Sequence, residues 1–140
     1  MSLFQIDKEN LPRHVAVIMD GNGRWAKKKG QRREYGHRAG RKAVKRIVES
    51  GAELKIKNLT LYAFSTENWN RPKLEIDFLM QLLLLSLKDE LKNLNKNNIK
   101  FETIGNLERL PKKIRNYLLK VKEETKDNLA LTLTLALSYG

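Results

Sequence analysis

The chain has 140 residues, which is enough for one domain with its own hydrophobic core. Its 28 Lys and Arg against 16 Asp and Glu give a net charge of +12, which indicates an anionic partner: a nucleic acid, an anionic membrane surface or a diphosphate. The lack of cysteine excludes a disulfide framework and a thiolate metal site. We also expect no signal peptide, because residues 1–10 contain no apolar run.

The first predicted element is a strand over residues 15–19, an uninterrupted apolar run typical of a strand covered on both faces. Asp20 follows at its carboxyl end, where open α/β sheets bind ligands. Gly21 and Gly23 flank Asn22 and allow the backbone to turn tightly and approach a ligand. Asp-Gly is also a common turn, so these residues alone leave open a ligand-binding loop and an ordinary turn before a solvated basic helix.

Basic residues dominate the sequence after this loop. Lys and Arg are concentrated in residues 24–46, where Glu34 is the only acidic residue. A carboxylate that can bind a hard divalent cation, free backbone N–H groups and several cations together indicate a site for a metal-bound diphosphate. The cations nearest to Asp20 in the sequence are Arg24, Arg33, His37 and Arg38.

Two helical segments are predicted in this basic region. Residues 24–29 form a short one that ends at Gly30, and residues 36–50 form a longer amphipathic one, with Gly51 as its stop signal. His37 lies at the start of the second helix, where its ring could reach a diphosphate or have a purely structural role.

The second predicted strand covers residues 59–64 and ends in the polar segment 65–72. Two strands with a helix between them predict a right-handed βαβ unit whose two loops meet at one sheet edge. Ser65, Asn68 and Arg71 are then expected to face Asp20 across a cleft. The alternative is a plain polar loop that leads into a helix.

The longest predicted helix covers residues 73–97, and its segment 78–87 is apolar on nearly every side. That apolar segment is about half the length needed to span a bilayer. The sequence favours a helix buried in the core over one that lines a hydrophobic tunnel.

The remaining elements complete an alternating pattern. A third strand is predicted over residues 99–104, a helix after Pro111 and a fourth strand over 129–138, where leucines alternate with small residues. The order β-α-β-α-β-α-β predicts a single α/β domain over residues 1–140, with a parallel sheet and helices on both faces.

Three sequence blocks resemble the cis-prenyltransferase family, most closely its undecaprenyl diphosphate synthase members. The blocks are HVAVIMDGNGRWA from His14, GHRAG from Gly36 and LYAFSTENWNRP from Leu61. The resemblance runs from about Leu11 to Gly140 and implies the cis-prenyltransferase α/β fold, not the all-helical trans-prenyltransferase fold. Because the family continues further, the chain is expected to be its N-terminal portion, truncated after the fourth strand.

The resemblance implies a transferase that condenses isopentenyl diphosphate with an allylic diphosphate such as farnesyl diphosphate. The implied product is a cis-polyprenyl diphosphate, undecaprenyl diphosphate for the bacterial cell-wall lipid carrier, and the implied cofactor is Mg²⁺. It further implies a cytoplasmic homodimer when full length, which contacts the membrane through its product and binds no nucleic acid. This chain alone is expected to be inactive, because further family residues for isopentenyl diphosphate and a second metal-binding Glu come later.

The resemblance also implies roles for individual residues. Asp20 is the implied metal ligand and a catalytic residue, and Asn68 is the second catalytic residue, which takes part in proton removal. Arg71 matches a contact to isopentenyl diphosphate. The implied substrate-binding residues are Gly21, Asn22, Gly23, Arg24, Trp25, Arg33, His37, Ser65, Thr66, Glu67, Trp69 and Arg71.

Two other functions compete with this one. A nucleic-acid-binding domain would use the basic surface of residues 24–46, but Tyr35 is the only aromatic residue there after Trp25, and common nucleic-acid motifs are absent. A non-catalytic partner subunit of the same fold would be expected to lose the catalytic loop, whereas DGNGRW is intact here.

Overall fold

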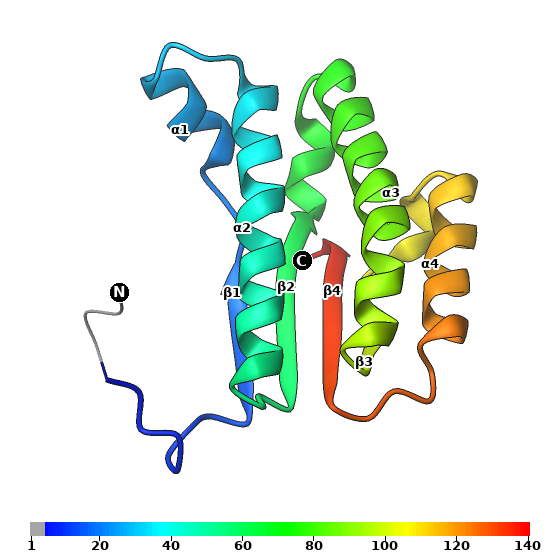
Figure 1. Cartoon of the computed structure of the whole chain (residues 1–140). Coiled ribbons are helices and arrows are strands. Elements are labelled where there is room, and N and C mark those ends of the chain that lie inside the picture. Colours follow the sequence, from blue (N-terminus) through cyan, green and yellow to red (C-terminus); the bar gives the residue numbers. More distant parts are fainter. Residues whose placement is uncertain (1–4) are drawn as a thin grey trace.

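A parallel β-sheet forms the centre of the computed structural model, which describes residues 5–140 (Figure 1). In this part of the chain the sheet is four-stranded, in the order β1-β2-β4-β3. The strands are β1 (His14–Ile18), β2 (Asn58–Ser65), β3 (Ile99–Ile104) and β4 (Leu131–Tyr139). The helices are α1 (Asn22–Lys28), α2 (Arg33–Glu53), α3 (Lys73–Lys96) and α4 (Lys112–Glu124), with short 3-10 helices η1 (Thr66–Asn70) and η2 (Leu107–Arg109). The predicted α/β fold with a parallel sheet is confirmed.

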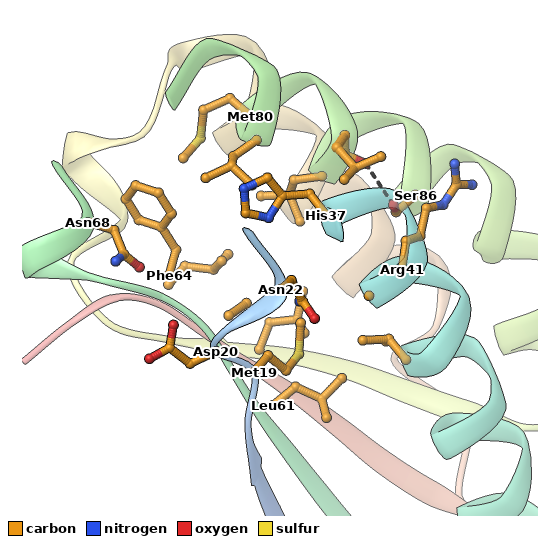
Figure 2. Close-up of a pocket in the computed structure, with 18 of the residues that line it drawn as sticks. Met19, Asp20, Asn22, His37, Arg41, Leu61, Phe64, Asn68, Met80 and Ser86 are labelled. Carbon is orange, nitrogen blue, oxygen red and sulfur yellow. Dashed lines mark hydrogen bonds between the residues drawn. The ribbon is translucent and has the colours of Figure 1, made fainter. Parts of the chain in front are cut away.

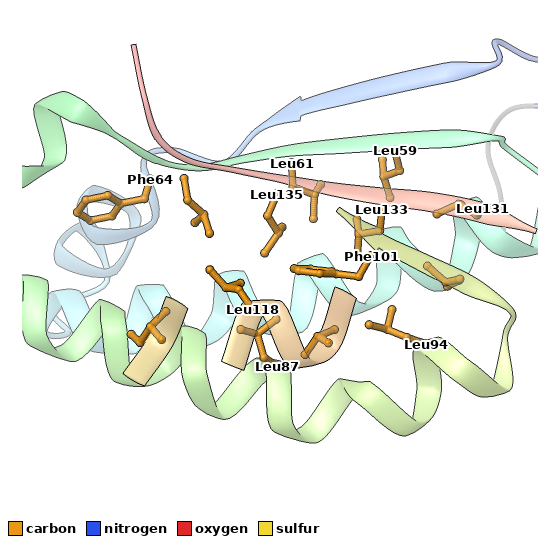
Figure 3. Close-up of a cluster of buried hydrophobic side chains, with 14 of the residues drawn as sticks. Leu59, Leu61, Phe64, Leu87, Leu94, Phe101, Leu118, Leu131, Leu133 and Leu135 are labelled. Atoms are coloured by element: carbon orange, nitrogen blue, oxygen red, sulfur yellow. The ribbon is translucent and has the colours of Figure 1, made fainter. Parts of the chain in front are cut away.

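One face of the sheet carries the hydrophobic core. The register pairs Leu59 with Leu133 and Leu61 with Leu135, so leucines of neighbouring strands lie side by side on this face. Phe101 of β3 is also level with Leu133 and points into the same cluster (Figure 3). The helices contribute buried Met80, Leu87 and Leu94 from α3 and Ile114, Leu118 and Val121 from α4. The leucine-rich face predicted for the last strand is therefore the core face.

The three long helices α2, α3 and α4 all pack on this leucine-bearing face (Figure 3). On the other face Ile18 is 73% exposed and Ile104 is also exposed. Strand β1, expected to be covered on both faces, has half-buried Val15 and Val17 alternating with exposed neighbours. Within residues 5–140 there is thus no second helical layer on the opposite face. The apolar run of residues 15–19 did not show whether one or both faces of the strand are covered.

Several element boundaries differ from those predicted. Helix α2 begins at Arg33 and continues through Gly51, which is not a stop signal. Gly51 is buried within the helix, and a Cβ there would lie 3.4 Å from the Leu131 side chain, an ordinary contact distance. The chain leaves the helix at Lys55, whose φ is 60°. Strand β4 begins at Leu131, and exposed Leu129 lies in the loop before it.

Helix α3 is largely a core helix, as the sequence favours. Its Met80, Leu87 and Leu94 are buried against the sheet, while Leu85 is exposed. Among residues 5–140, no helix combines the length and apolarity that a bilayer crossing requires.

Candidate active site

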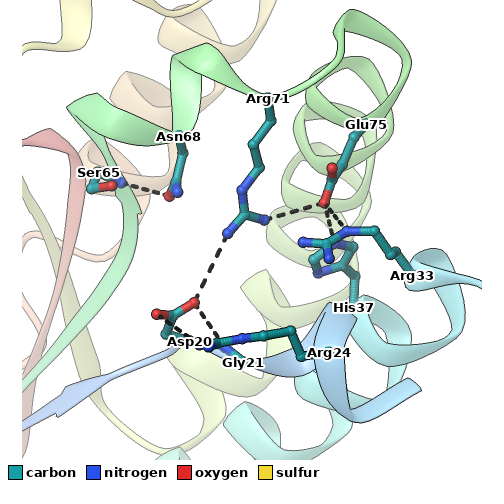
Figure 4. Close-up of polar contacts among 9 residues, drawn as sticks. All are labelled: Asp20, Gly21, Arg24, Arg33, His37, Ser65, Asn68, Arg71 and Glu75. Atoms are coloured by element: carbon teal, nitrogen blue, oxygen red, sulfur yellow. Dashed lines mark hydrogen bonds and ion pairs between the residues drawn. The ribbon is translucent and has the colours of Figure 1, made fainter. Parts of the chain in front are cut away.

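Asp20 lies two residues after the end of β1, at the carboxyl end of the sheet (Figure 4). Its Oδ1 accepts a 2.7 Å hydrogen bond from the N–H of Gly21, and Gly21, with φ of 86°, is the N-cap of α1. The Asp20 side chain is 62% exposed, and the nearest cations are Arg24 at 3.8 Å and Arg71 at 3.9 Å. The carboxylate is therefore open to solvent and held at the edge of a basic site.

Glycines of α2 place the Asp20 loop against that helix. A Cβ at Gly36 would lie 1.9 Å from the carbonyl oxygen of Asn22, and one at Gly40 would lie 2.4 Å from the Asn22 side chain. A Cβ at Gly23 would lie 2.6 Å from the guanidinium carbon of Arg33. The glycine spacing of GHRAG thus allows the loop backbone to touch α2 and brings Arg33 beside the loop.

Glu75, near the start of α3, is a candidate site residue that sequence reasoning missed. Its side chain is only 9% exposed. Its Oε1 accepts hydrogen bonds from Arg33 Nε at 2.9 Å and Arg71 Nη1 at 3.2 Å, and lies 3.1 Å from Nε2 of His37 (Figure 4). The i,i+4 spacing of Arg71 and Glu75 gave no helical signal, because Arg71 precedes the N-cap Pro72 and lies outside α3.

The surroundings of Glu75 favour its ionised form. Burial raises the pKa of the carboxyl, but the hydrogen bonds from Arg33 and His37, followed by the charges of Arg33 and Arg71, outweigh it and lower the pKa below the usual 4.5. At neutral pH Glu75 is therefore an anion that holds together side chains from α2, from the η1–α3 junction and from α3.

The polar segment after β2 forms the opposite wall of the site. The N–H of Ser65 donates a 3.0 Å hydrogen bond to Oδ1 of Asn68, and the two residues form a capping box at the start of η1. This contact engages the amide oxygen of Asn68 and leaves its NH₂ group for a ligand. An amide NH₂ group donates hydrogen bonds and does not accept a proton, so a role of Asn68 in proton removal stays a prediction.

The two tryptophans of the motif blocks do not line the cleft, and their implied role in substrate binding stays a prediction. Nε1 of Trp69 donates a 2.9 Å hydrogen bond to Ser138 Oγ, and its ring packs edge-on against Phe64 with centroids 4.7 Å apart. Trp69 thereby anchors η1 to the end of β4. Trp25 is 41% exposed and stacks on Tyr35 on the outside of the molecule. Among the described residues, neither tryptophan lines the cleft.

A single cleft of about 1240 Å³ brings the other predicted site residues together. Its polar end lies at Asp20 and Asn68, and apolar side chains of the sheet, α2 and α3, including Leu61, Phe64 and Met80, line much of the rest together with charged residues such as Arg41 (Figure 2). Such a cleft suits a ligand with an anionic head and a long hydrocarbon tail. The predicted residues that line it are Asp20, Gly21, Asn22, Gly23, Arg24, Arg33, His37, Ser65, Thr66, Glu67, Asn68 and Arg71.

The site fits a metal ion that has few protein ligands and is also bound by its substrate. Residues 5–140 contain no group of three or more His, Asp and Glu side chains placed to hold a metal ion. Mg²⁺ is commonly bound by one or two carboxylates, with water and substrate phosphates as its other ligands. The exposed carboxylate of Asp20, beside cations that would receive a diphosphate, fits this second arrangement.

The sequence is similar to that of a known protein family and its members. The family model described as "Putative undecaprenyl diphosphate synthase" matches residues 18–140. An isoprenyl transferase of Clostridium tetani is 49% identical over 137 residues, which are 98% of this chain and 54% of that protein. A ditrans,polycis-undecaprenyl-diphosphate synthase ((2E,6E)-farnesyl-diphosphate specific) of Pasteurella multocida is 47% identical over 138 residues, 99% of this chain and 58% of that protein. The chain spans about half the length of the curated relatives it matches.

Solved structures share the fold. Lavandulyl diphosphate synthase from Lavandula x intermedia, in complex with dimethylallyl diphosphate, superposes with a TM-score of 0.87 at 36% identity, over 92% of this chain and 56% of that one. A probable undecaprenyl diphosphate synthase from Campylobacter jejuni superposes with a TM-score of 0.75 at 42% identity, over 94% of this chain and 56% of that one.

Proposed function

The chain belongs to the undecaprenyl diphosphate synthase family of prenyltransferases, and from that premise we propose that its cleft binds an isoprenoid diphosphate for cis-prenyl transfer. In this reaction an allylic diphosphate such as farnesyl diphosphate loses its diphosphate group. The allylic carbon that carried this group then bonds to the alkene of isopentenyl diphosphate. Loss of one proton leaves a cis double bond. The observation that supports this proposal is the combination of a basic, Asp20-bearing end with many apolar side chains in one cleft.

The basic end receives the diphosphate. Arg24 and Arg33 each offer a planar guanidinium that can contact two phosphate oxygens, and the glycines of the loop let a phosphate approach the backbone. Gly21, Gly23 and His37 line the same end of the cleft. The hydrocarbon tail lies among the apolar side chains of the sheet, α2 and α3, where its burial contributes to affinity.

Asp20 would hold Mg²⁺, which when bound would withdraw charge from the departing diphosphate. Arg24 and Arg71 lie near the same carboxylate, so their charges face the position where negative charge develops. Fixed cations at that position lower the barrier because they need no reorientation during the reaction.

The wall formed by residues 65–71 receives isopentenyl diphosphate. Arg71 holds its diphosphate, and Ser65, Thr66 and Glu67 surround the remaining polar space. Asn68, with its NH₂ group directed by the bond to Ser65, positions the group that loses the proton. The alkene is thereby held in line with the allylic carbon, which supplies much of the rate.

The proposal extends to the role of the protein in the cell. It is a cytoplasmic homodimer that makes undecaprenyl diphosphate for the bacterial cell-wall lipid carrier and meets the membrane through this product. The names of bacterial relatives as undecaprenyl-diphosphate synthases, some specific for (2E,6E)-farnesyl diphosphate, support this choice of substrate and product.

A chimeric protein tests the proposal. Residues 1–140 would replace the matching part of the C. tetani relative, whose remaining length would follow them. With Mg²⁺, farnesyl diphosphate and radiolabelled isopentenyl diphosphate, the chimera is expected to form long-chain product that butanol extracts and mass spectrometry identifies. The 140-residue chain alone is expected to form none. A folded, monodisperse chimera without product would contradict the proposal.

A further inference from the structure

An exposed aromatic pair lies at the tip formed by α1 and the turn into α2. Trp25 is 41% exposed and Tyr35 is 46% exposed. Their rings stack with centroids 5.8 Å apart and planes within 7°, and Nζ of Lys29 lies 4.5 Å from the Trp25 ring centroid. Neither ring contributes to the cleft or to the core cluster. The proposed chemistry therefore leaves this pair unexplained.

The tip is strongly basic and firmly attached. Arg24, Lys27, Lys28 and Arg32 are exposed beside the aromatic pair, and Glu34 is the only acidic residue in this stretch. Ala26 is fully buried, and the backbone of Asn22 lies against Gly36, so α1 is fixed to α2. The tip is thus a fixed surface that combines positive charge with two exposed rings.

The position of the tip relates it to the cleft. Figure 1 shows α1 and the turn into α2 at the carboxyl end of the sheet, the end where Asp20 begins the loop. Helix α3 also begins at this end, and its second residue, Leu74, is 85% exposed. One end of the molecule therefore carries exposed apolar side chains, a basic surface and the polar end of the cleft.

We propose that this tip, residues 24–35, docks on anionic membrane surfaces. Trp and Tyr prefer the headgroup level of a bilayer, since each has an apolar ring and a polar atom. Lys and Arg near the surface attract anionic lipids. This inference rests on the proposed function and deepens it, because docking of the tip would bring the cleft to the membrane surface that accepts a lipid product.

The ring contacts favour a membrane over a nucleic acid. Single-stranded nucleic acids bind aromatic side chains by stacking bases on open ring faces. Tyr35 and Lys29 already lie against the Trp25 ring, which leaves less of its surface for a base. Insertion at headgroup level needs only the exposed edges of the two rings.

Vesicle sedimentation with matched charge variants tests the proposal. The test variant is Lys27→Gln/Lys28→Gln/Arg32→Gln in the tip. The control variant is Lys57→Gln/Lys92→Gln/Lys96→Gln, which removes the same charge from other exposed positions. On vesicles of phosphatidylcholine with phosphatidylglycerol, we expect the test variant to bind about tenfold or more weakly than the control variant. Equal binding of the two variants would overturn the proposal, because the net charge of the protein, and not the charges of the tip, would then explain vesicle binding.

Fluorescence quenching tests the insertion of Trp25. Brominated lipids in the same vesicles are expected to quench part of the tryptophan emission, and Trp25→Phe is expected to remove that quenched part. Unchanged quenching in Trp25→Phe would place Trp69 and not Trp25 near the lipid and overturn the proposal. Binding of single-stranded RNA that the tip substitutions abolish, with vesicle binding unchanged, would overturn it in favour of a nucleic acid. These measurements need no substrate, so their failure leaves the chimera assay for prenyl transfer unaffected.

Discussion

The Nε atom of Arg33 donates a 2.9 Å hydrogen bond to the Glu75 carboxylate, and this contact joins the start of α2 to the start of α3. Glu75 also contacts His37 and Arg71 through the same oxygen. A single buried anion therefore sets the positions of three side chains that line the polar end of the cleft. Such fixed placement matters for binding a diphosphate, because it lowers the cost of ordering these side chains when the ligand arrives.

Replacing Glu75 by Gln should destabilise the protein. The substitution keeps the shape of the side chain but removes the charge that Arg33 and Arg71 face, so we expect a loss of about 1–3 kcal/mol in the free energy of unfolding. Urea denaturation measures it. The control Glu53→Gln removes an exposed carboxylate and should change the same free energy by about 0.5 kcal/mol or less. Equal effects of the two substitutions would show that Glu75 stabilises nothing.

The Glu75 contribution should also depend on pH in one direction. The folded-state pKa of Glu75 is lowered, so its contribution is fully present above the unfolded value of 4.5 and is lost as the pH falls through the folded value. The difference in unfolding free energy between wild type and Glu75→Gln should therefore be constant above pH 4.5 and shrink below it. A difference that grows on acidification would reverse the assigned direction.

Much of the polar end of the cleft could be predicted from the sequence, because its causes are local. An apolar run followed by Asp-Gly located the strand end at Asp20, and the polar segment after β2 located the opposite wall. Glu75 could not be found in this way. In the sequence it resembles an exposed acid in the first turn of a helix, and its burial depends on Arg33 and His37, which come from a distant part of the chain.

The remaining differences also come from tertiary packing. Glycine is typical of a helix end, but Gly51 lies buried inside a continuing helix that packs on the sheet. Trp25 and Trp69 stand in the motif blocks, yet one is exposed on the surface and the other anchors η1. The apolar α3 residues were favoured as core, whereas Leu79 and Leu83 also line the cleft. Residue type and spacing do not encode which side of an element meets a cleft.

Gly36→Ala should loosen the Asp20 loop. The new methyl group would lie 1.9 Å from the carbonyl oxygen of Asn22, so α1 must move away from α2. We expect a loss of about 1–3 kcal/mol in stability, as overpacking typically costs, and weaker binding of farnesyl diphosphate. Thermal unfolding and titration calorimetry measure the two effects.

Gly30→Ala is the matched control for that substitution. Unlike Gly36, Gly30 has a positive φ, 72°, but a Cβ there would meet no atom within 4 Å. It should cost about 1–2 kcal/mol through backbone strain and leave the affinity for farnesyl diphosphate unchanged. An equal loss of affinity in both variants would mean that the contact between Gly36 and Asn22 does not place the loop.

Arg71→Lys should separate the two substrates in the chimeric enzyme. Arg71 lies 3.9 Å from Asp20 and 3.2 Å from Glu75, and a lysine cannot reproduce this two-sided contact or grip two phosphate oxygens in one plane. We expect the KM for isopentenyl diphosphate to rise more than the KM for farnesyl diphosphate, as steady-state kinetics would show. Arg109→Lys, which alters a cation near Trp69 outside the cleft, is the control. Equal rises in both KM values would contradict separate positions for the two substrates.

Calorimetric titration of the 140-residue chain with a thiodiphosphate analogue of farnesyl diphosphate tests the central claim most directly. The comparison is between wild type and Asp20→Asn, with and without Mg²⁺. Asparagine keeps an oxygen that can accept the hydrogen bond from Gly21 but removes the charge. We predict that Mg²⁺ strengthens binding to the wild type and that Asp20→Asn loses about tenfold or more in affinity, equivalent to about 1.4 kcal/mol. Equal affinities for both proteins, with no effect of Mg²⁺, would contradict a diphosphate site organised around Asp20.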